Sequence, residues 1–310
     1  VIARNEAVVT TYDTTSDEDI VFGVGLGCKG VITILIEPMQ PPDPVVDFIR
    51  FARSRLQDRT PGIAATVIRT HGRVAAMIGS RLLLREGSVV SNIAASELMG
   101  RIQNEMQILS ESGSRTITIA LEGGAAQLFV EHIEPSTPLL VFGAGHDAMP
   151  VVRLAKELGW HVTVIDQRPG YASSARFPQA DRIVVCAPKD VAAQVALQDH
   201  TLALVMTHNY LRDLDLLEIL LPSQVRYLGL LGPRTRTDQL LVDLRKKGAR
   251  PTTRQLGRFY APVGLDIGSE GPAEVALSIL SEMHAVMTSH RGGHLRERKR
   301  PIHQPENAAA

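Results

Sequence analysis

The segment 139–150 holds the residues whose types and spacing point most directly to chemistry. Its short apolar run breaks into Gly-x-Gly-x-x-Ala, with Gly143, Gly145 and Ala148, and then into a helical pattern. Gly143 permits a tight turn, Gly145 lets the backbone approach a pyrophosphate, and Ala148 is small enough for the helix to pack on its strand. The start of that helix would offer free amides and a positive dipole end to an anion. The segment is therefore typical of a dinucleotide phosphate cradle.

An acidic residue follows at the position where such cradles bind a ribose. Asp166 ends the apolar run 162–165, roughly 20 residues after the first glycine, and a carboxylate there can accept hydrogen bonds from both ribose hydroxyls. Arg168, close behind it, either contacts a phosphate or is ordinary surface. Strand, glycines, helix, strand and acid in this order favour dinucleotide binding over a Rossmann-shaped domain whose cradle is empty or structural.

Strands and helices alternate regularly in this half of the chain. The pattern predicts strands at 139–145, 161–166, 182–187, 201–207 and 226–231, and helices at 148–158, 190–197, 211–220 and 235–247. Fully apolar strands in such an order indicate a doubly wound parallel sheet with helices on both faces, a Rossmann-like α/β domain. Ligands of these sheets bind at the carboxyl ends of the strands. The candidate cofactor-binding residues at those ends are Gly143, Gly145, His146, Asp147, Asp166, Arg168, Thr207, His208, Gly232 and Arg234.

The side chains at these ends allow different roles. His146 at the helix start would be a neutral hydrogen-bonding group, because the helix dipole disfavours its protonation, and Asp147 would cap the helix. His208 faces the crevice, where it is either functional or structural. Arg234 and Arg236 either clamp a phosphate or form a solvated first turn.

A second glycine-rich loop precedes an apolar strand near the start of the chain. In 23–30 it carries Gly27, Cys28, Lys29 and Gly30. Successive amides of such a loop can hold an anion, and Lys29 would lower the thiol pKa of Cys28. A thiolate so presented makes Cys28 a candidate for ligating a soft metal or for contact with a sulfur-rich cofactor. A tight turn that uses the cysteine as a small apolar residue explains the loop equally well.

Composition limits the classes of function. With 310 residues the chain favours two domains, and its 33 basic and 33 acidic residues balance, so we expect neither nucleic acid nor a membrane as partner. No apolar run approaches the roughly 20 residues of a membrane span, and no signal peptide is visible, so we expect a cytoplasmic protein. The two cysteines lie far apart and imply no disulfide framework, and Cys186, in an apolar run, is expected in the core.

The first part of the chain, 1–134, predicts an α+β domain. We expect a buried strand at Val31–Ile36, a helix at 45–57, paired strands 63–70 and 73–84 around His71-Gly72, a helix within 91–109, and a hairpin of 115–120 and 126–133 around Gly123-Gly124. The segment 135–138 resembles a linker. The Rossmann-like domain would then cover 135–260, and 261–310 would hold a last helix at Pro272–Met287 and a mobile basic tail. Because the chain begins at Val1 without methionine, we expect further residues upstream.

Several segments together resemble a known family. These are 22–30 with Glu37-Pro38, 140–147, 164–169, Thr207-His208, 227–232 and 261–268, in the order found in the XdhC/CoxF accessory factors for xanthine dehydrogenase and related molybdenum hydroxylases. The resemblance implies an N-terminal XdhC/CoxI-type domain before the Rossmann-like one. It also implies a chaperone that binds molybdenum cofactor and delivers it, in sulfurated form, to a target apoenzyme. Two departures are an absent upstream Gly-Gly-Cys-Leu-Glu motif and Lys29 in place of a glycine.

Two functions therefore remain. In the first, the cradle and the Cys28 loop, on facing domains, hold molybdopterin, with the dinucleotide form left open; a sulfurase and a second copy of the chain are further partners that this hypothesis allows. In the second, the chain is an NAD(P)-dependent oxidoreductase in which His208 transfers protons beside a nicotinamide. The sequence contains no nucleophile elbow or P-loop, and no catalytic residue is named. That absence favours the chaperone.

Overall fold

The chain forms two compact units. The computed structural model describes residues 6–13, 31–38, 47–85, 88–109 and 113–299. The first unit ends at Pro135 and the second begins at Ser136. The second unit contains most of the candidate cofactor-binding residues that the sequence predicts.

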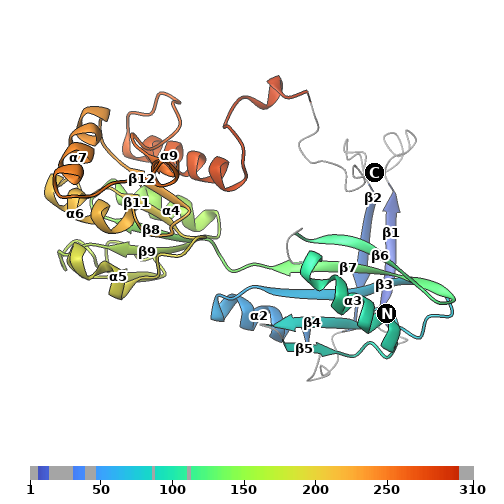
Figure 1. Cartoon of the computed structure of the whole chain (residues 1–310). Helices are drawn as coiled ribbons and strands as arrows, with labels where there is room; N and C mark the ends of the chain where they lie inside the picture. Colours follow the sequence, from blue (N-terminus) through green and yellow to red (C-terminus); the bar gives the residue numbers. More distant parts are fainter. Residues whose placement is uncertain (1–5, 14–30, 39–46, 86–87, 110–112, 300–310) are drawn as a thin grey trace. The chain divides into compact units, whose positions relative to one another are not determined.

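The first unit is built on an antiparallel sheet with a helix on each face. Its strand order is β5-β4-β3-β7-β6, from β3 (Gly62–Gly72), β4 (Arg81–Arg85), β5 (Ser88–Ser91), β6 (Arg115–Leu121) and β7 (Gly124–Ile133). Leu98 and Ile102 of α3 (Ser96–Leu109) pack on one face, and Phe51 of α2 (Phe48–Asp58) packs on the other (Figure 1). The expected α+β class is confirmed for this unit.

One of the two expected hairpins is present as predicted. β6 and β7 pair antiparallel around Gly123-Gly124, with Leu121 opposite Gly124. The strands expected at 63–70 and 73–84 do pair antiparallel, as β3 and β4, with Ile63 opposite Leu84. Only the turn expected at His71-Gly72 is wrong: β3 runs on to Gly72, where it pairs with Gly124 of β7, and β4 begins only at Arg81. The long β3–β7 pairing joins segments distant in sequence, which no local turn signal can indicate.

A two-stranded ribbon of β1 (Val8–Asp13) and β2 (Val31–Ile36) also belongs to this unit. The strand at β2 was expected and is present, but its expected burial is wrong, since Val31 is 59% and Ile32 56% exposed. Within the described residues β2 pairs only with β1, so its apolar side chains have no sheet to pack against. At the base of the ribbon, Glu37 accepts a hydrogen bond from Arg81 at 2.5 Å.

The second unit is a parallel six-stranded sheet in Rossmann order. The order is β10-β9-β8-β11-β12-β13, from β8 (Pro138–Phe142), β9 (His161–Ile165), β10 (Arg182–Val184), β11 (Leu202–Val205), β12 (Tyr227–Leu230) and β13 (Phe259–Tyr260). The chain order reverses beside β8, which places a crevice at the carboxyl ends of β8 and β11. The Rossmann-like doubly wound sheet predicted from the sequence is confirmed.

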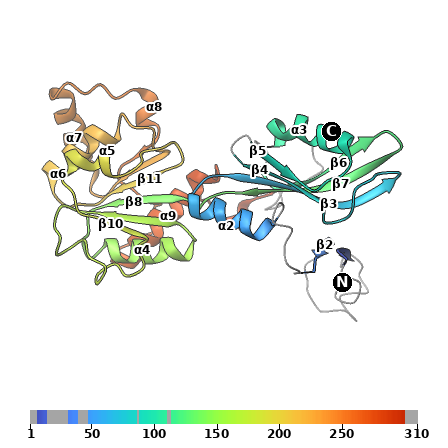
Figure 2. The ribbon, with the colours of Figure 1, turned by 90° about the horizontal axis from the view of Figure 1, so that it is seen from below.

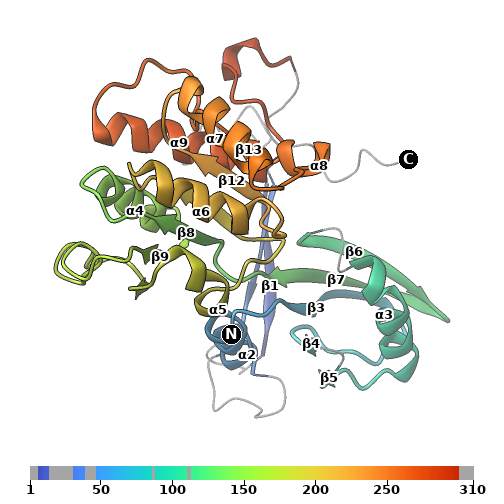
Figure 3. The same ribbon diagram turned by 60° about the vertical axis from the view of Figure 1, so that its left-hand side comes forward.

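Helices cover both faces of this sheet (Figure 2). Leu139 and Val141 of β8 face the core under α4 (Ala148–Glu157) and α9 (Pro272–Met287). Leu140 and Phe142 face the other core, under α5 (Val191–Gln194), α6 (Tyr210–Leu220) and α7 (Arg234–Lys246). On that face α6 and α7 lie side by side (Figure 3). The remaining short helical segments are η1 (Pro188–Asp190), α8 (Thr253–Leu256) and η2 (Leu295–Glu297).

The helix expected at 190–197 is much shorter in the structure. Only Val191–Gln194 is α-helical, because the backbone at Val195 turns extended while its side chain stays buried in the core. Burial of Val195 thus overrides the helical pattern of the alanines before it.

Helix α9 is an integral part of the second unit. Glu282 on α9 accepts hydrogen bonds from the Tyr227 hydroxyl on β12 and, at 3.1 Å, from the Gly264 amide. The Tyr227 ring stacks on Tyr260 of β13 with 4.5 Å between ring centroids. Residues of α9 share one hydrophobic core with β8, β9 and β11, so the division expected at residue 260 falls inside this unit.

Candidate functional site

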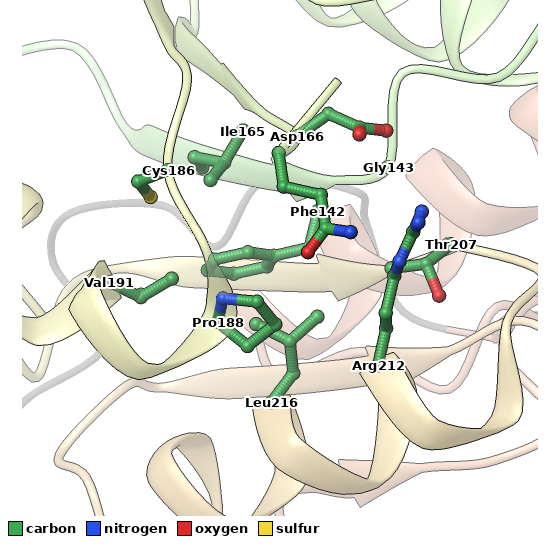
Figure 4. A pocket seen from close by; sticks show the side chains of 11 residues that line it. Phe142, Gly143, Ile165, Asp166, Cys186, Pro188, Val191, Thr207, Arg212 and Leu216 are labelled. Atoms are coloured by element: carbon green, nitrogen blue, oxygen red, sulfur yellow. The ribbon is translucent and has the colours of Figure 1, made fainter.

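The crevice lies where β8, β9 and β11 end. Gly143, Asp166 and Thr207 follow these strands and line one pocket (Figure 4). They come together because parallel strands present their carboxyl ends at one edge of the sheet. The sequence-predicted residues Gly145, Asp147 and His208 also meet at this edge.

The two glycines of the cradle are required for different reasons. Gly143 has φ +112°, and a Cβ there would lie 2.4 Å from the carbonyl oxygen of Met206. Its amide donates a hydrogen bond to the Ile165 carbonyl at 2.8 Å, so Gly143 continues the pairing of β8 with β9. The backbone that follows β11 passes close to Gly143 on the other side. At Gly145 a Cβ would meet a carboxylate oxygen of Asp147 at 2.5 Å. The space above Gly145 is therefore occupied by the chain's own acidic side chain.

Asp147 pairs with His208 across the crevice. The Asp147 carboxylate lies 2.5 Å from Nε2 of His208, whose side chain is 60% exposed. The expectation that Asp147 caps α4 is wrong: its backbone is helical, with φ −69° and ψ −21°, and its side chain makes no capping hydrogen bond. His208 has φ +56°, a conformation that costs a non-glycine residue energy and is often found at functional sites.

The amides beside this pair are available to an anion. Among the described residues, none accepts a hydrogen bond from the amides of Gly145, His146 or Asp147. The His146 side chain is exposed. The free amides and the Asp147 carboxylate thus lie at the same edge of the sheet. An anion that binds these amides would have to approach past the carboxylate.

Asp166 is fully engaged within the chain. It is 6% exposed, and its carboxylate accepts four hydrogen bonds: from the Ala144 amide and Arg168 Nη2 at 2.9 and 2.6 Å, and from the Arg168 amide and Nε, both at 2.9 Å. Burial raises the pKa of Asp166, but the hydrogen bonds and charge of Arg168 and the Ala144 amide outweigh it, and the net pKa is lowered. A ribose accepted here would displace Arg168.

Arg168 has a definite position. Its guanidinium lies over the Tyr171 ring, 4.0 Å from the centroid, while it bonds Asp166. The carboxylate of Asp166 raises the pKa of Arg168. The side chain remains about one-third exposed, so it can turn toward a phosphate from this position.

A buried carboxylate that the sequence did not single out organises the end of β11. Asp213 on α6 is 1% exposed and accepts hydrogen bonds from Thr207 Oγ1 and Arg236 Nη2, each at 2.5 Å. Arg236 is therefore committed to Asp213, whereas Arg234 is exposed at the start of α7. Gly232 lies against Arg236, since a Cβ on it would meet Cδ of that residue at 3.2 Å. The sequence signal that could have identified Asp213 is a carboxylate among the leucines of α6.

The pocket beside Asp166 has apolar walls and a polar rim (Figure 4). Its cavity volume is about 20 Å³, which is room for about one water molecule. The apolar walls are Phe142, Ile165, Pro188, Val191 and Leu216. On the rim, the side-chain oxygen of Gln167 accepts two hydrogen bonds from the Arg212 guanidinium, from Nε at 3.1 Å and from Nη2 at 2.8 Å. Neither Gln167 nor Arg212 stood out in the sequence.

Cys186 belongs to this rim as well. The expectation that it is a core residue is wrong, because β10 ends at Val184 and Cys186 lies half-buried beyond it, lining the pocket. Burial raises the pKa of its thiol, and the charge of Asp190 raises it further. The loop with Gly27, Cys28, Lys29 and Gly30 lies outside the described residues, so its proposed metal contact stays a prediction.

The described part of the chain contains neither a metal cluster nor a membrane span. No group of three or more His, Cys, Asp or Glu side chains there is arranged to hold a metal ion. None of the helices in that part combines the length and the apolar character that crossing a membrane requires.

Comparison with known proteins gives consistent matches. Residues 139–283 match the profile of a family described as the XdhC Rossmann domain. A Bacillus subtilis protein whose name describes it as a probable xanthine dehydrogenase component is 31% identical over 273 residues, which are 88% of this chain and 74% of that protein. The uncharacterised Escherichia coli protein YqeB is 25% identical over 250 residues, 76% of this chain and 46% of YqeB. A crystal structure described as a xanthine dehydrogenase from Bacillus halodurans is similar with a TM-score of 0.72 and 25% identity, over 93% of this chain and 77% of that one.

Proposed function

Because the chain belongs to the XdhC family, we propose that it is an accessory protein of a xanthine dehydrogenase-type molybdenum hydroxylase. In this proposal it binds the molybdenum cofactor and hands it to the apoenzyme. The names of the Bacillus relatives, which refer to xanthine dehydrogenase, support an association with such an enzyme. The observation that carries the proposal from this chain is the crevice at the carboxyl ends of β8, β9 and β11.

The donor set of the crevice fits the phosphate end of such a cofactor. The amides of Gly145 and His146 are free to donate, and Arg168 and Arg234 are exposed enough to add charge. The carboxylate of Asp147 opposes an anion in its present position and would have to turn aside. When bound, the cofactor would supply the molybdenum and its sulfur ligand; the chain's own residues would bind, orient and shield it.

A cytoplasmic place of action suits this role. Cys186 is a free thiol, as expected in a reducing compartment, and the proposed client is assembled with its cofactor before it functions. The apoenzyme is the partner that this proposal requires. A sulfurase and a second copy of the chain remain further proposed partners.

One observation favours a second candidate, an NAD(P)-dependent oxidoreductase. The Asp147–His208 pair supplies an acid and a base at the edge where a nicotinamide would lie in a sheet of this strand order. The pair was not visible in the sequence, which suggested no acid–base set. It supports proton transfer only if a dinucleotide binds.

Purification from two hosts tests the proposal. We expect the full chain from a host that makes molybdenum cofactor to carry molybdenum by elemental analysis and a fluorescent pterin after oxidation. The same chain from a host unable to make the cofactor is the control and should carry neither. The chain purified with its cofactor should activate an apo-hydroxylase, and the cofactor-free control should not. NADH fluorescence that is enhanced by the protein, with no pterin in either preparation, would instead support the oxidoreductase.

A further inference from the structure

An open apolar groove runs along α9 in the second unit. The residues of α9 that line it form one stripe: Leu277, Leu280, Ser281, His284, Ala285 and Thr288. Helix α4 lies beside α9 (Figure 2) and adds Leu154 and Leu158 from its carboxyl end. Positions three and four apart share one face of a helix, so this stripe and the end of α4 make a continuous floor.

The segment 290–298, called the tail wall below, forms the other side of the groove. The chain turns back after α9 at Ser289, which has φ +58°, and the His290 amide donates to a carbonyl in the last turn of the helix at 2.7 Å. Gly292 lies against Leu265, since a Cβ on it would lie 2.9 Å from the leucine Cδ1. These contacts attach the tail wall to the second unit, and the groove stays open beside it.

Three leucines around the groove lack an apolar cover. Leu158 of α4 is 49% exposed, Leu277 of α9 is 53% exposed and Leu295 of η2 is 63% exposed. The groove has a volume of about 1110 Å³, above the range of roughly 300–1,000 Å³ that small-molecule pockets occupy. Exposed leucines on three elements around so large a groove fit a partner helix that inserts apolar side chains from one face.

The charge of the tail wall indicates the polar face of such a helix. The tail wall contains three arginines, Arg291, Arg296 and Arg298, against one glutamate, Glu297. Within the described ranges no carboxylate pairs with Arg291 or Arg298, both of which line the groove. The remaining carboxylate of the lining is Glu157, which lies at the end of α4. A partner with acidic side chains beside the tail wall would therefore complement its charge.

We propose that this groove docks an amphipathic helix of a partner protein, with leucine-type side chains on its apolar face and acidic side chains beside the tail wall. Within the proposed function, on which the identity of the partner rests, that protein is the apo-hydroxylase. The groove does not overlap the crevice. Helix α4 connects the parallel strands β8 and β9 and runs back along them, so its end lies toward the opposite edge of the sheet. The second unit can thus hold a ligand in the crevice while a partner occupies the groove.

Two synthetic peptides of about 18 residues test the chemistry of the partner. Both have leucines three and four positions apart, and the polar face carries glutamates in one and lysines in the other. The peptides are labelled, and fluorescence anisotropy measures their binding to the full chain. We expect the glutamate peptide to bind at least about tenfold more tightly than the lysine peptide, with a smaller difference at high salt. A chain that binds neither peptide, or both equally, would overturn the proposal.

Matched variants locate the binding. Leu277→Glu places a carboxylate in the groove, whereas Leu211→Glu makes the same change on α6, at an exposed position over the other face of the sheet. Leu277→Glu should weaken binding of the glutamate peptide at least about tenfold, and Leu211→Glu should bind it like the wild type. An equal affinity in these two variants contradicts the proposal.

Charge reversal gives an independent variant that leaves the apolar floor intact. Arg291→Glu should bind the lysine peptide more tightly than the glutamate peptide, which reverses the preference of the wild type. Arg245→Glu, on α7, changes the net charge of the chain equally and should keep the wild-type preference. A preference that Arg291→Glu leaves unchanged would show that the tail wall does not select the partner.

A lipid surface is the other occupant that a basic, apolar groove could take. Sedimentation with phosphatidylglycerol vesicles measures it. Vesicles that bind the wild type but not Leu277→Glu, with no binding of either peptide, would make the groove a membrane site and overturn the proposal.

The activation of an apo-hydroxylase separates this inference from the proposed function. Leu277→Glu should retain molybdenum and pterin like the wild type but activate the apoenzyme at least about tenfold less well. Peptide binding by a chain that never copurifies with molybdenum or pterin would keep the groove and remove the accessory role. Copurified cofactor and normal activation by Leu277→Glu, with no peptide binding, would keep the accessory role and overturn the groove.

Discussion

The carboxylate of Asp147 lies 2.5 Å from Nε2 of His208, and the two residues are 61 positions apart in the chain. Asp147 directly precedes α4 and His208 follows β11, so the pair joins the two sides of the crevice directly above Gly145. His208 makes this contact from a left-handed backbone conformation, with φ +56°. The Asp147 carboxylate of this pair would therefore repel an anion that approached the amides of Gly145 and His146.

Removing the charge of Asp147 should favour anion binding. In Asp147→Asn the repulsion of a phosphate at the cradle is lost, and we expect inorganic pyrophosphate to bind about tenfold more tightly in calorimetric titration. Asp199→Asn is the matched control, since Asp199 also pairs with a histidine, His200, but is largely exposed to solvent. Equal affinity in all three proteins would show that Asp147 does not guard the amides.

The two cradle glycines should respond differently to alanine. Gly143→Ala places a Cβ against the Met206 carbonyl in a left-handed backbone, and we expect a loss of at least about 3 kcal/mol of unfolding free energy. Gly145→Ala meets only the flexible end of Asp147, so the fold should survive while Asp147 moves off His208. Urea denaturation measures the first effect, and NMR shifts of the His208 ring nitrogens measure the second. A Gly145→Ala variant with unchanged His208 shifts would contradict this account.

Asp166 should stabilise the folded state in a pH-dependent way. Its pKa is lowered in the folded chain, so its contribution is present above its unfolded pKa of about 3.9 and is lost as the pH falls through the lower folded value. Asp166→Asn loses the charged bonds to Arg168 and should cost about 2 kcal/mol at neutral pH. Denaturation at several pH values should show the difference from wild type narrowing below about pH 4. A difference that is constant with pH would rule out the ionised carboxylate as its source.

The Asp213 network should be important for stability. Asp213→Ala leaves Arg236 and Thr207 without their buried partner, and we expect a loss of about 3 kcal/mol. Asp215→Ala, on the same helix, removes an exposed pairing with Lys247 and should change stability by less than about 0.5 kcal/mol. Thermal unfolding measures the loss of stability in both variants. An equal loss in the two would mean that the buried hydrogen bonds of Asp213 do not contribute more than the exposed pairing of Asp215.

The parallel sheet was predictable because its signals are local. β8 and β11 are short, wholly apolar runs, and each is followed by turn residues and a helical pattern, as at Phe142, Gly143 and Ala148. β13 was missed because two residues carry no periodicity. The exposure of Val31 and Ile32 was missed because an apolar pattern reports a preference for burial and not the presence of a covering element.

The candidate site was only half predictable. Sequence position places Gly143, Asp166 and Thr207 at strand ends, and the structure brings these ends together. Sequence position does not show which hydrogen-bond partner a side chain has. Asp166 accepts from its near neighbour Arg168, whereas Asp147 pairs with His208 in a loop distant in sequence. Such pairings depend on the spacing of elements after folding, which no motif encodes.

The contact of Glu282 with Tyr227 and Gly264 bears on the order in which the chain can fold during synthesis. On the ribosome the strands of the second unit emerge well before α9, which carries the last wall of their core. Until that helix is translated, the Tyr227 hydroxyl on β12 lacks its acceptor, and the part of the sheet face that α9 covers stays exposed to water. Completion of the core beneath the crevice thus depends on the arrival of a segment that contributes no residue to the pocket lining.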